Sequence, residues 1–339
     1  MKKHLVVAAG LAVLSTGAFA SKARMAALNQ GSSLGSFYLE DNRNVFRSSN
    51  SVNSMNNYVI TEWGSSYIPG GAAATAEGGF FRSHGAMNYG LYLNSDAHGN
   101  VDNNLNPARV DLVVGGDAGL NWGLRLGYES MEAAGSNHEA SGFDLGLSAT
   151  VSGANLWLNY APATTSTVAN AETERNADMT LGATYGMGDY TLFAEYASEG
   201  QDGDKDASTS ITVGAAKVWE TSGGASVFYD ASIVSTANYD LAGTTYAADN
   251  SKLSVPVTLG VEVKAASWLT WRASIQQSVY GSHEDAAGTV TSGRTTNLGA
   301  GASLTWGDLQ IDGTIRNASG GQLGSDDQFM SSVAAMYRF

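Results

Sequence analysis

The sequence predicts an all-β fold, a transmembrane antiparallel up-and-down β-barrel, and three observations favour it. Side chains alternate between apolar and polar with a period of two, and connections alternate between short and long. The last predicted strand ends on an aromatic residue, Phe339. The clearest segment is 253–263, where Leu253, Val255 and Val257 alternate with Ser254 and Thr258. This period gives each strand one apolar and one polar face. A barrel that crosses a membrane requires such faces, one toward lipid and one toward the lumen.

The connections between these segments fall into two length classes. A soluble β-sandwich also has strands with one apolar face, but it rarely combines long, even strands with such regular alternation of loop length. A membrane barrel has short periplasmic turns and longer outer loops. The pattern therefore favours the barrel over the sandwich. Short turns occur at 119–121, 151–153, 186–188, 221–224, 265–266 and 307, and longer polar connections at 95–107, 131–140, 162–176, 199–207, 236–250, 281–293 and 319–329.

The number of strands depends on the N-terminal segment. From Gly78 to Phe339 the alternation gives 14 strands, and 78–94 is taken as one of them. Within 21–77, Tyr58–Trp63 is typical of a strand, Phe37–Leu39 is a candidate for another, and 23–29 favours a short helix. If both candidates pair, the barrel has 16 strands. If neither does, 21–77 is a plug that enters the lumen or lies under it.

The first 20 residues have the pattern of a cleaved secretory signal peptide. Lys2 and Lys3 precede the apolar stretch 5–14, and the segment closes on Ala18-Phe19-Ala20. The predicted organisation is therefore a signal peptide at 1–20, a plug or first hairpin at 21–77, and a barrel at 78–339. We expect export to the cell outer membrane, which argues against a cytoplasmic enzyme. No later stretch has the ~18 consecutive apolar residues of a transmembrane helix.

The charge balance is strongly acidic. The chain has 18 Lys and Arg against 32 Asp and Glu, and removal of the two signal lysines leaves a net charge of −16. Such a charge repels phosphates and argues against a nucleic-acid partner. The chain has no cysteine, which excludes disulfides, thiolate nucleophiles and cysteine metal sites.

The polar faces predict a charged, pore-lining surface. Acidic and basic members are equal in number, and a water-filled channel keeps such charges hydrated at little cost, whereas an apolar path does not. The predicted pore-lining residues are Asp111, Glu129, Asp144, Glu195, Asp230, Glu262 and Asp312, together with Arg82, Arg109, Arg125, Lys264, Arg272, Arg316 and Arg338.

No catalytic, metal or cofactor site is predicted. The histidines are scattered, and the chain has no Gly-x-Ser-x-Gly or His-Glu-x-x-His pattern. Asp202, Asp204 and Asp206 imitate the start of a calcium loop, but Ala207 and Val213 stand where that loop needs Gly and Glu. We interpret these acidic loops as solvated tips that concentrate cations at the mouth.

The last strand resembles the C-terminal insertion signal of bacterial outer-membrane proteins. Ser332, Ala334, Tyr337 and Phe339 occupy its polar, small, aromatic and terminal aromatic positions, with Ala334 in place of the usual Gly. The resemblance implies recognition by the barrel-assembly machinery.

Two further resemblances concern longer stretches. Residues 21–52 are similar to the N-terminal region of 14-stranded barrels that include long-chain fatty-acid transporters, although Arg47-Ser48-Ser49-Asn50 replaces the Asn-Pro-Ala of that group. The whole chain resembles the porin-like major outer-membrane proteins of predatory delta-proteobacteria. The residues that match the transporter group are Ala23, Arg24, Ala27, Leu28, Asp41, Val45 and Phe46.

These observations together favour a porin that passes small hydrophilic solutes and ions by diffusion, without a cofactor. Two alternatives stay open: a transporter for hydrophobic molecules in which 21–77 acts as a hatch, and a structural or adhesive barrel that does not conduct. The expected partners are outer-membrane lipid and lipopolysaccharide, the barrel-assembly machinery, small solutes and ions, and further copies of the chain in a homotrimer.

Overall fold

The computed structural model describes residues 21–55, 57–64, 76–98, 108–117, 119–133, 138–168, 171–200, 208–237, 250–284, 289–317 and 332–339. The predicted signal peptide and the acidic loop 202–206 lie outside these residues. Three short helices begin the described chain: α2 (Lys22–Ala27), α3 (Asn44–Arg47) and the 3-10 helix η2 (Ser49–Ser54). Among the described residues, no helix is long and apolar enough to cross a membrane.

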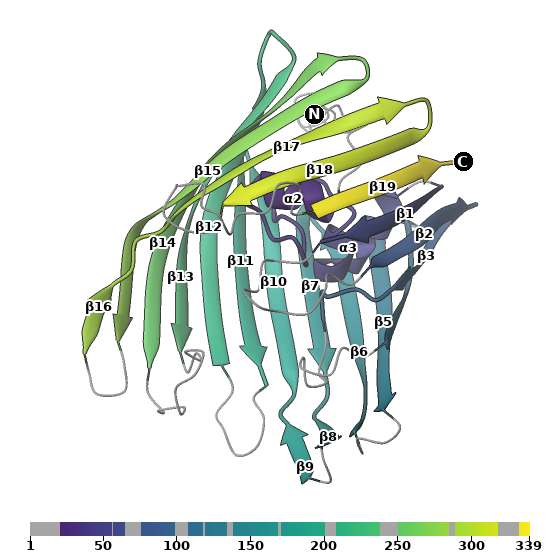
Figure 1. The fold of residues 1–339 in the computed structure, drawn as a ribbon, viewed down its shortest axis with the longest axis vertical. Coiled ribbons are helices and arrows are strands. Elements are labelled where there is room, and N and C mark those ends of the chain that lie inside the picture. The colour runs from purple at the N-terminus through teal and green to yellow at the C-terminus, as the bar shows by residue number, and fades with distance from the viewer. Residues whose placement is uncertain are drawn as a thin grey trace.

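The strands form a closed antiparallel barrel of 16 strands. Figure 1 shows how they are arranged around the two helices. Consecutive strands pair around the ring, and β1 closes it by pairing with both β2 and β19. The hairpin β8–β9 and the short β16 extend the sheet beyond the ring at the long-loop end. The barrel strands are β1 (Tyr58–Trp63), β2 (Glu77–His84), β3 (Met87–Leu93), β4 (Ala108–Asp117), β5 (Asn121–Ala133), β6 (His138–Val151), β7 (Ala154–Ala161), β10 (Asp178–Met187), β11 (Tyr190–Glu199), β12 (Ser208–Glu220), β13 (Ala225–Ala237), β14 (Ser251–Ala266), β15 (Leu269–Glu284), β17 (Thr296–Trp306), β18 (Leu309–Asn317) and β19 (Ser332–Arg338), and the extensions are β8 (Thr164–Val168), β9 (Ala171–Arg175) and β16 (Val290–Ser292).

The count of 14 strands from Gly78 onward is wrong, because 78–94 is a hairpin and not one strand. β2 and β3 pair from Gly78↔Leu93 to His84↔Met87 across the two-residue turn Gly85-Ala86. Gly85 has φ +61°, a conformation that such tight turns require and that glycine adopts without strain. This hairpin and β1 together bring the ring to 16, whereas 37–39 forms no strand.

The outer face of the barrel is apolar. In β4 exposed and buried residues alternate, with Leu112 exposed and Asp111 buried. Leu126, Phe143, Leu181 and Leu259 continue the exposed apolar surface around the ring. The period-two alternation predicted from the sequence is therefore the alternation between the outer and the inner wall. Aromatic side chains are exposed near strand ends, among them Tyr185, Tyr190, Trp268, Trp306 and Tyr337.

The N-terminal residues 21–55 lie inside the barrel, and we call this segment the plug. Figure 1 shows α2 and α3 within the ring of strands, near its short-turn end. Ser21 caps α2 by accepting a hydrogen bond from the amide of Arg24 at 3.1 Å. The segment 21–77 thus divides into a plug, a closing strand and the start of β2.

Two apolar clusters attach the plug to the inner wall. In the first, Val45, Phe46 and Val52 pack with wall residues that include Phe81 and Tyr92. The second joins Met25, Leu28 and Leu39 of the plug to Phe228 of β13. Burial of these side chains supplies the non-directional part of the docking energy.

The closing register can be tested with cysteines, because the chain has none of its own. Thr61 of β1 faces Ala335 of β19 across the closing pair. We expect Thr61→Cys with Ala335→Cys to form a disulfide under mild oxidation, seen as a reductant-sensitive change of mobility in electrophoresis. Ala334→Cys is the matched control, because adjacent strand residues point to opposite faces. Equal cross-linking of Ala334→Cys would contradict this register.

Candidate functional site: the plugged lumen

The plug carries basic side chains that pair with carboxylates near the closing strands. Lys22 forms ion pairs with Glu77 and with Asp96, the latter at 2.6 Å. Arg43 is fully buried and binds Glu77 at 2.9 Å and Asp96 at 2.8 Å. It also lies 3.5 Å from Glu62 of β1. Two plug cations therefore pair with three carboxylates, one each from β1, β2 and the loop after β3.

A second ionic network anchors α2 to strands on the other flank of β1. Arg24 pairs with Glu262 of β14, which also accepts a hydrogen bond from Arg272 Nε at 2.6 Å. Arg272 lies 3.5 Å from Asp312 of β18. Ser21 completes the network by donating to Asp312 Oδ2 at 2.8 Å. The start of the plug is thus fixed to three strands.

The third anchor combines charge with aromatic packing. Arg47 Nε donates to Glu195 Oε2 at 3.2 Å, and Trp157 Nε1 donates to the same oxygen at 3.2 Å. The guanidinium of Arg47 lies 3.8 Å from the ring centre of Phe37. Phe37 in turn stacks on Phe193 of β11 at 4.5 Å. A buried cation over a ring face is a favourable arrangement.

One cluster of charges belongs to the wall alone. Arg109 and Arg125 both lie 2.8 Å from Asp111 Oδ1, and Arg125 lies 2.5 Å from Asp144. Arg109 also pairs with Asp144 and lies 3.6 Å from Glu129. All five side chains are buried. They cross-link neighbouring strands β4, β5 and β6 on the inner face.

The predicted pore-lining residues thus fall into groups with different environments. The structure brings together the wall cluster of β4–β6 and the network of Glu262, Arg272 and Asp312, and it places Glu195 and Asp230 against the plug. Lys264 is exposed on the lumen-facing side of β14 near the short turns. Arg338 is partly buried at the end of β19, and the side chain of Arg316 lies outside the described part.

The structure contradicts the prediction that Arg82 lines the pore. It is exposed on β2 and alternates with buried Phe81, so it lies on the outer face and not in the lumen. The physical reason is the hairpin. Residues that pair across a two-residue turn share a face, so the inward positions change from odd numbers in β2 to even numbers in β3, where Gly90 pairs with Phe81.

Sequence reasoning missed the basic residues of the plug as site residues. A local charge count contains the signal: 21–55 holds four basic and two acidic residues, in a chain whose overall balance is acidic. Glu62, Glu77 and Asp96 were missed as well, because they lie in or beside the segment whose strand assignment was incomplete. The basic residues are Lys22, Arg24, Arg43 and Arg47, and the acidic ones are Glu40 and Asp41.

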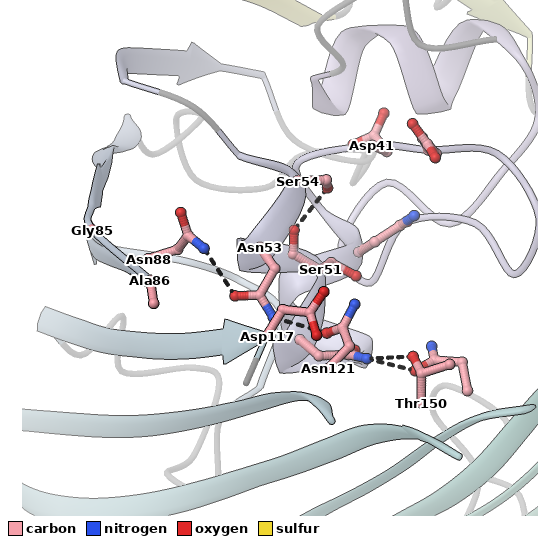
Figure 2. A pocket seen from close by; sticks show the side chains of 14 residues that line it. Asp41, Ser51, Asn53, Ser54, Gly85, Ala86, Asn88, Asp117, Asn121 and Thr150 are labelled. Carbon is pink, nitrogen blue, oxygen red and sulfur yellow. Dashed lines mark hydrogen bonds between the residues drawn. The ribbon is translucent and has the colours of Figure 1, made fainter. Parts of the chain in front are cut away.

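A polar cavity of about 500 Å³ lies between the plug and the short turns (Figure 2). Asparagine side chains dominate its wall. Asn53 donates to Asn121 Oδ1 at 2.8 Å and accepts from Asn88 at 3.1 Å, and Asn50 donates to Thr150 Oγ1 at 3.1 Å. We call this space the short-turn cavity. It is lined by Glu40, Asp41, Asn44, Asn50, Ser51, Asn53, Ser54, Gly85, Ala86, Asn88, Asp117, Asn121, Thr150 and Asn155.

A second cavity of about 280 Å³ lies between the plug and strands β11–β15. We call it the mid-barrel cavity, because its wall residues lie near the middle of their strands. Asp230 of β13 accepts hydrogen bonds here from the Tyr38 hydroxyl and, at 3.5 Å, from Gln30. Plug residues between 35 and 47 contribute to both cavities, so this stretch stands between them.

Burial sets the protonation of two groups beside the plug. It raises the pKa of Asp41 from 3.8 to about 8, although Arg24 lies 3.4 Å away and lowers it. Burial lowers the pKa of His98 to about 3, so this ring is neutral at pH 7. His98 Nε2 lies 2.6 Å from the carbonyl of Phe46 and donates to it, because a carbonyl oxygen only accepts.

No family model and no curated protein matches this chain. Among solved structures it is similar to Salmonella typhi OmpF, at 12% identity over 84% of this chain and 97% of that chain, with a TM-score of 0.46. It is similar to OccAB2 of Acinetobacter baumannii at 12% identity, over 84% and 97%, with a TM-score of 0.40. A mutant Rh. blastica porin matches at 13% identity, over 84% and 99%, with a TM-score of 0.37.

Fold and lumen together define a closed β-barrel that contains an N-terminal plug. The solved structures include porins, but identities of this size carry no conclusion about activity or solutes. The resemblances to delta-proteobacterial proteins and to the fatty-acid transporter group stay predictions.

Removal of Arg43 should loosen the plug. Arg43→Met leaves Glu77 and Glu62 buried with less compensation, and breaking a buried pair costs about 3–5 kcal/mol. We expect the free energy of unfolding in urea, followed by tryptophan fluorescence in detergent, to fall by that amount. Lys217→Met, which removes an exposed pair with Asp189, should leave it nearly unchanged. Equal effects of the two variants would show that Arg43 contributes nothing specific.

The raised pKa of Asp41 predicts a pH-dependent stability. The folded chain holds this proton more tightly than the unfolded chain, so Asp41 costs stability progressively as pH rises from about 4 to about 8. Asp41→Asn removes that cost. The melting temperature of the variant should exceed that of the wild type at pH 9 and approach it at pH 4. A gap between the two that is independent of pH would contradict the assignment.

Proposed function

We propose that the protein is an outer-membrane channel for the passive diffusion of small hydrophilic solutes and ions, with a plug that restricts the passage. One observation carries the proposal: the barrel is apolar outside, and both described cavities are lined mainly by polar and charged side chains. Water fills such a lumen readily, because water can hydrate polar and charged side chains that an apolar environment would leave unsatisfied. No covalent step and no cofactor enters the proposed function.

The hydrophobic-transporter alternative receives less support. The apolar side chains of the plug, such as Val45, Phe46 and Leu28, are buried in packed contacts with the wall. These three do not line either described cavity, although Phe37 lines the mid-barrel cavity. A hydrophobic cargo would therefore meet mainly amides, hydroxyls and carboxylates in both described cavities.

The plug restricts the passage because it is attached on all sides. Its anchors reach β1 and β2 through Arg43, β14 and β18 through α2, and β11 through Arg47. The stretch 35–47 separates the two cavities. A solute that crosses the barrel therefore has to pass beside residues 35–47.

Location and assembly belong to the same proposal. The apolar belt suits a lipid bilayer, and the signal peptide and C-terminal strand suit export and insertion by the barrel-assembly machinery. Contacts with outer-membrane lipid and lipopolysaccharide, and a homotrimer, are proposed as partners on the strength of the sequence alone.

Glycines on the inner wall offer a direct test of the plugged channel. A Cβ on Gly123 would clash with the backbone of Ser49 and Asn50 in the plug. On lumen-facing Gly186 of β10, it would meet nothing within 4 Å. We therefore expect Gly123→Ala to displace η2 and raise single-channel conductance in a planar bilayer by about twofold or more, while Gly186→Ala matches the wild type.

Three outcomes of this measurement decide the proposal. Stable conductance steps that rise only in Gly123→Ala would support a plugged aqueous channel. Silence from folded wild type and from folded Gly123→Ala would overturn it in favour of a barrel without a pore. Wild-type steps that Gly123→Ala leaves unchanged would show that the plug does not restrict the passage.

A further inference from the structure

The mid-barrel cavity contains a buried carboxylate that has no cationic partner. Asp230 is only 7% exposed, and among the described residues no Lys, Arg or His lies within 4.0 Å of it to form an ion pair. Its described hydrogen bonds come from neutral donors, the Tyr38 hydroxyl, the Thr258 hydroxyl and Gln30. An isolated buried carboxylate is costly unless a positive charge compensates it.

The other charges of this cavity cancel. Arg47 is paired with Glu195 at 3.2 Å, donates to the carbonyl of Gly35 at 3.1 Å, and lies over the ring of Phe37. These contacts compensate the positive charge of Arg47. The lining of the cavity therefore has a formal net charge of −1, which Asp230 supplies.

A second and independent observation is that the mid-barrel cavity contains a buried hydrogen-bond acceptor to which no described group donates. Asn29 lines the cavity, is 6% exposed, and has no hydrogen-bond partner for Oδ1 among the described residues. The orientation of its amide is fixed, because Nδ2 donates to Ser274 Oγ at 3.0 Å and to the carbonyl of Asn297 at 3.3 Å. A carbonyl cannot donate, so the amide cannot be reversed. A buried unpaired acceptor is unfavourable, and a ligand N–H would satisfy it.

Asn29 and Asp230 belong to one hydrogen-bonded wall. Gln276 Nε2 lies 3.5 Å from the carbonyl of Asn29 and donates to Thr258 Oγ1 at 3.2 Å, and Thr258 is the cross-strand neighbour of Asp230. The rings of Phe37, Tyr38 and Phe193 form the apolar part of the lining. The cavity thus offers a carboxylate and an acceptor beside an apolar wall.

We propose that the mid-barrel cavity binds a small organic cation with N–H donors, a primary ammonium on a short aliphatic stem. The ammonium pairs with Asp230, and the Oδ1 atom of Asn29 accepts a further N–H bond. The stem packs on the aromatic rings. A volume of about 280 Å³ equals roughly nine waters at ~30 Å³ each, which limits the ligand to a small molecule.

Glu172, Glu174 and Glu284 at the long-loop end of the sheet fit this ligand class, because carboxylates raise the local concentration of cations. The inference rests on the proposed function in one respect, since the ligand reaches the cavity through the lumen. It deepens that function by naming a preferred class of solute.

Calorimetry on the folded full chain in detergent, at constant ionic strength, tests the proposal without requiring conduction. The probe is 1,4-diaminobutane dihydrochloride, and the control probe is 1,4-butanediol, which has the same length and no charge. We expect the diamine to bind and the diol not to bind. Asp230→Asn keeps the acceptor for Tyr38 and removes the charge, so it should weaken diamine binding by about tenfold or more. Asp189→Asn, in an exposed turn, should leave it unchanged.

Three results would overturn the proposal: no diamine binding to the wild type, equal binding to Asp230→Asn, or equal binding of diol and diamine, which would indicate a site for neutral hydroxylated molecules. If Asp230→Asn does not fold, Ser232→Lys replaces it. Ser232 also lines the cavity, and an attached ammonium there should abolish diamine binding. Diamine binding by a folded protein that does not conduct would leave this site intact and overturn only the proposed channel.

Discussion

The structure depends on charge neutralisation between a basic segment and an acidic ring. A 16-stranded ring encloses more space than its own inward side chains fill. The plug enters that space with buried cations, of which Arg43 and Arg24 are 7% exposed or less at their side chains. Each would be unfavourable in the lumen without its carboxylate partners. The same holds for Glu77 in the absence of the plug, because its ion pairs are with Lys22 and Arg43, whereas Glu262 keeps its pair with Arg272.

Charge alone does not fix the position of the plug. Ion pairs select which carboxylates each cation meets, and the apolar clusters around Phe46 and Leu28 supply burial. Close approach requires small wall residues as well. Gly123 admits the backbone of η2, and Gly299 of β17 admits the carbonyl of Ala27. These three requirements act at different places on the ring, so the plug has one well-defined position.

The barrel could be predicted from the sequence because its strands obey a strict local rule. In segments such as 253–263, residues on the outer face are apolar and residues on the inner face are polar. Apolar and polar residues therefore alternate along the sequence with a period of two. The hairpin at Gly85-Ala86 escaped that rule, because its turn has only two residues and no polar loop marks it. Arg82 was misplaced for the same reason. Closure by β1 was foreseen as one alternative, since Tyr58–Trp63 has the strand pattern.

The plug contacts could not be predicted in this way, since they join residues far apart in the chain. Arg24 and Glu262 are 238 positions apart, and nothing local to either indicates the other. The mid-barrel cavity shows most clearly what the sequence pattern does not predict. The alternation does predict that Asp230 faces inward, but its special property is the absence of a nearby cation among the described residues. That property depends on where Arg47 lies, and Glu195 together with Phe37 determines the position of Arg47. A ligand preference in this lumen therefore arises from the docked plug and not from any strand by itself.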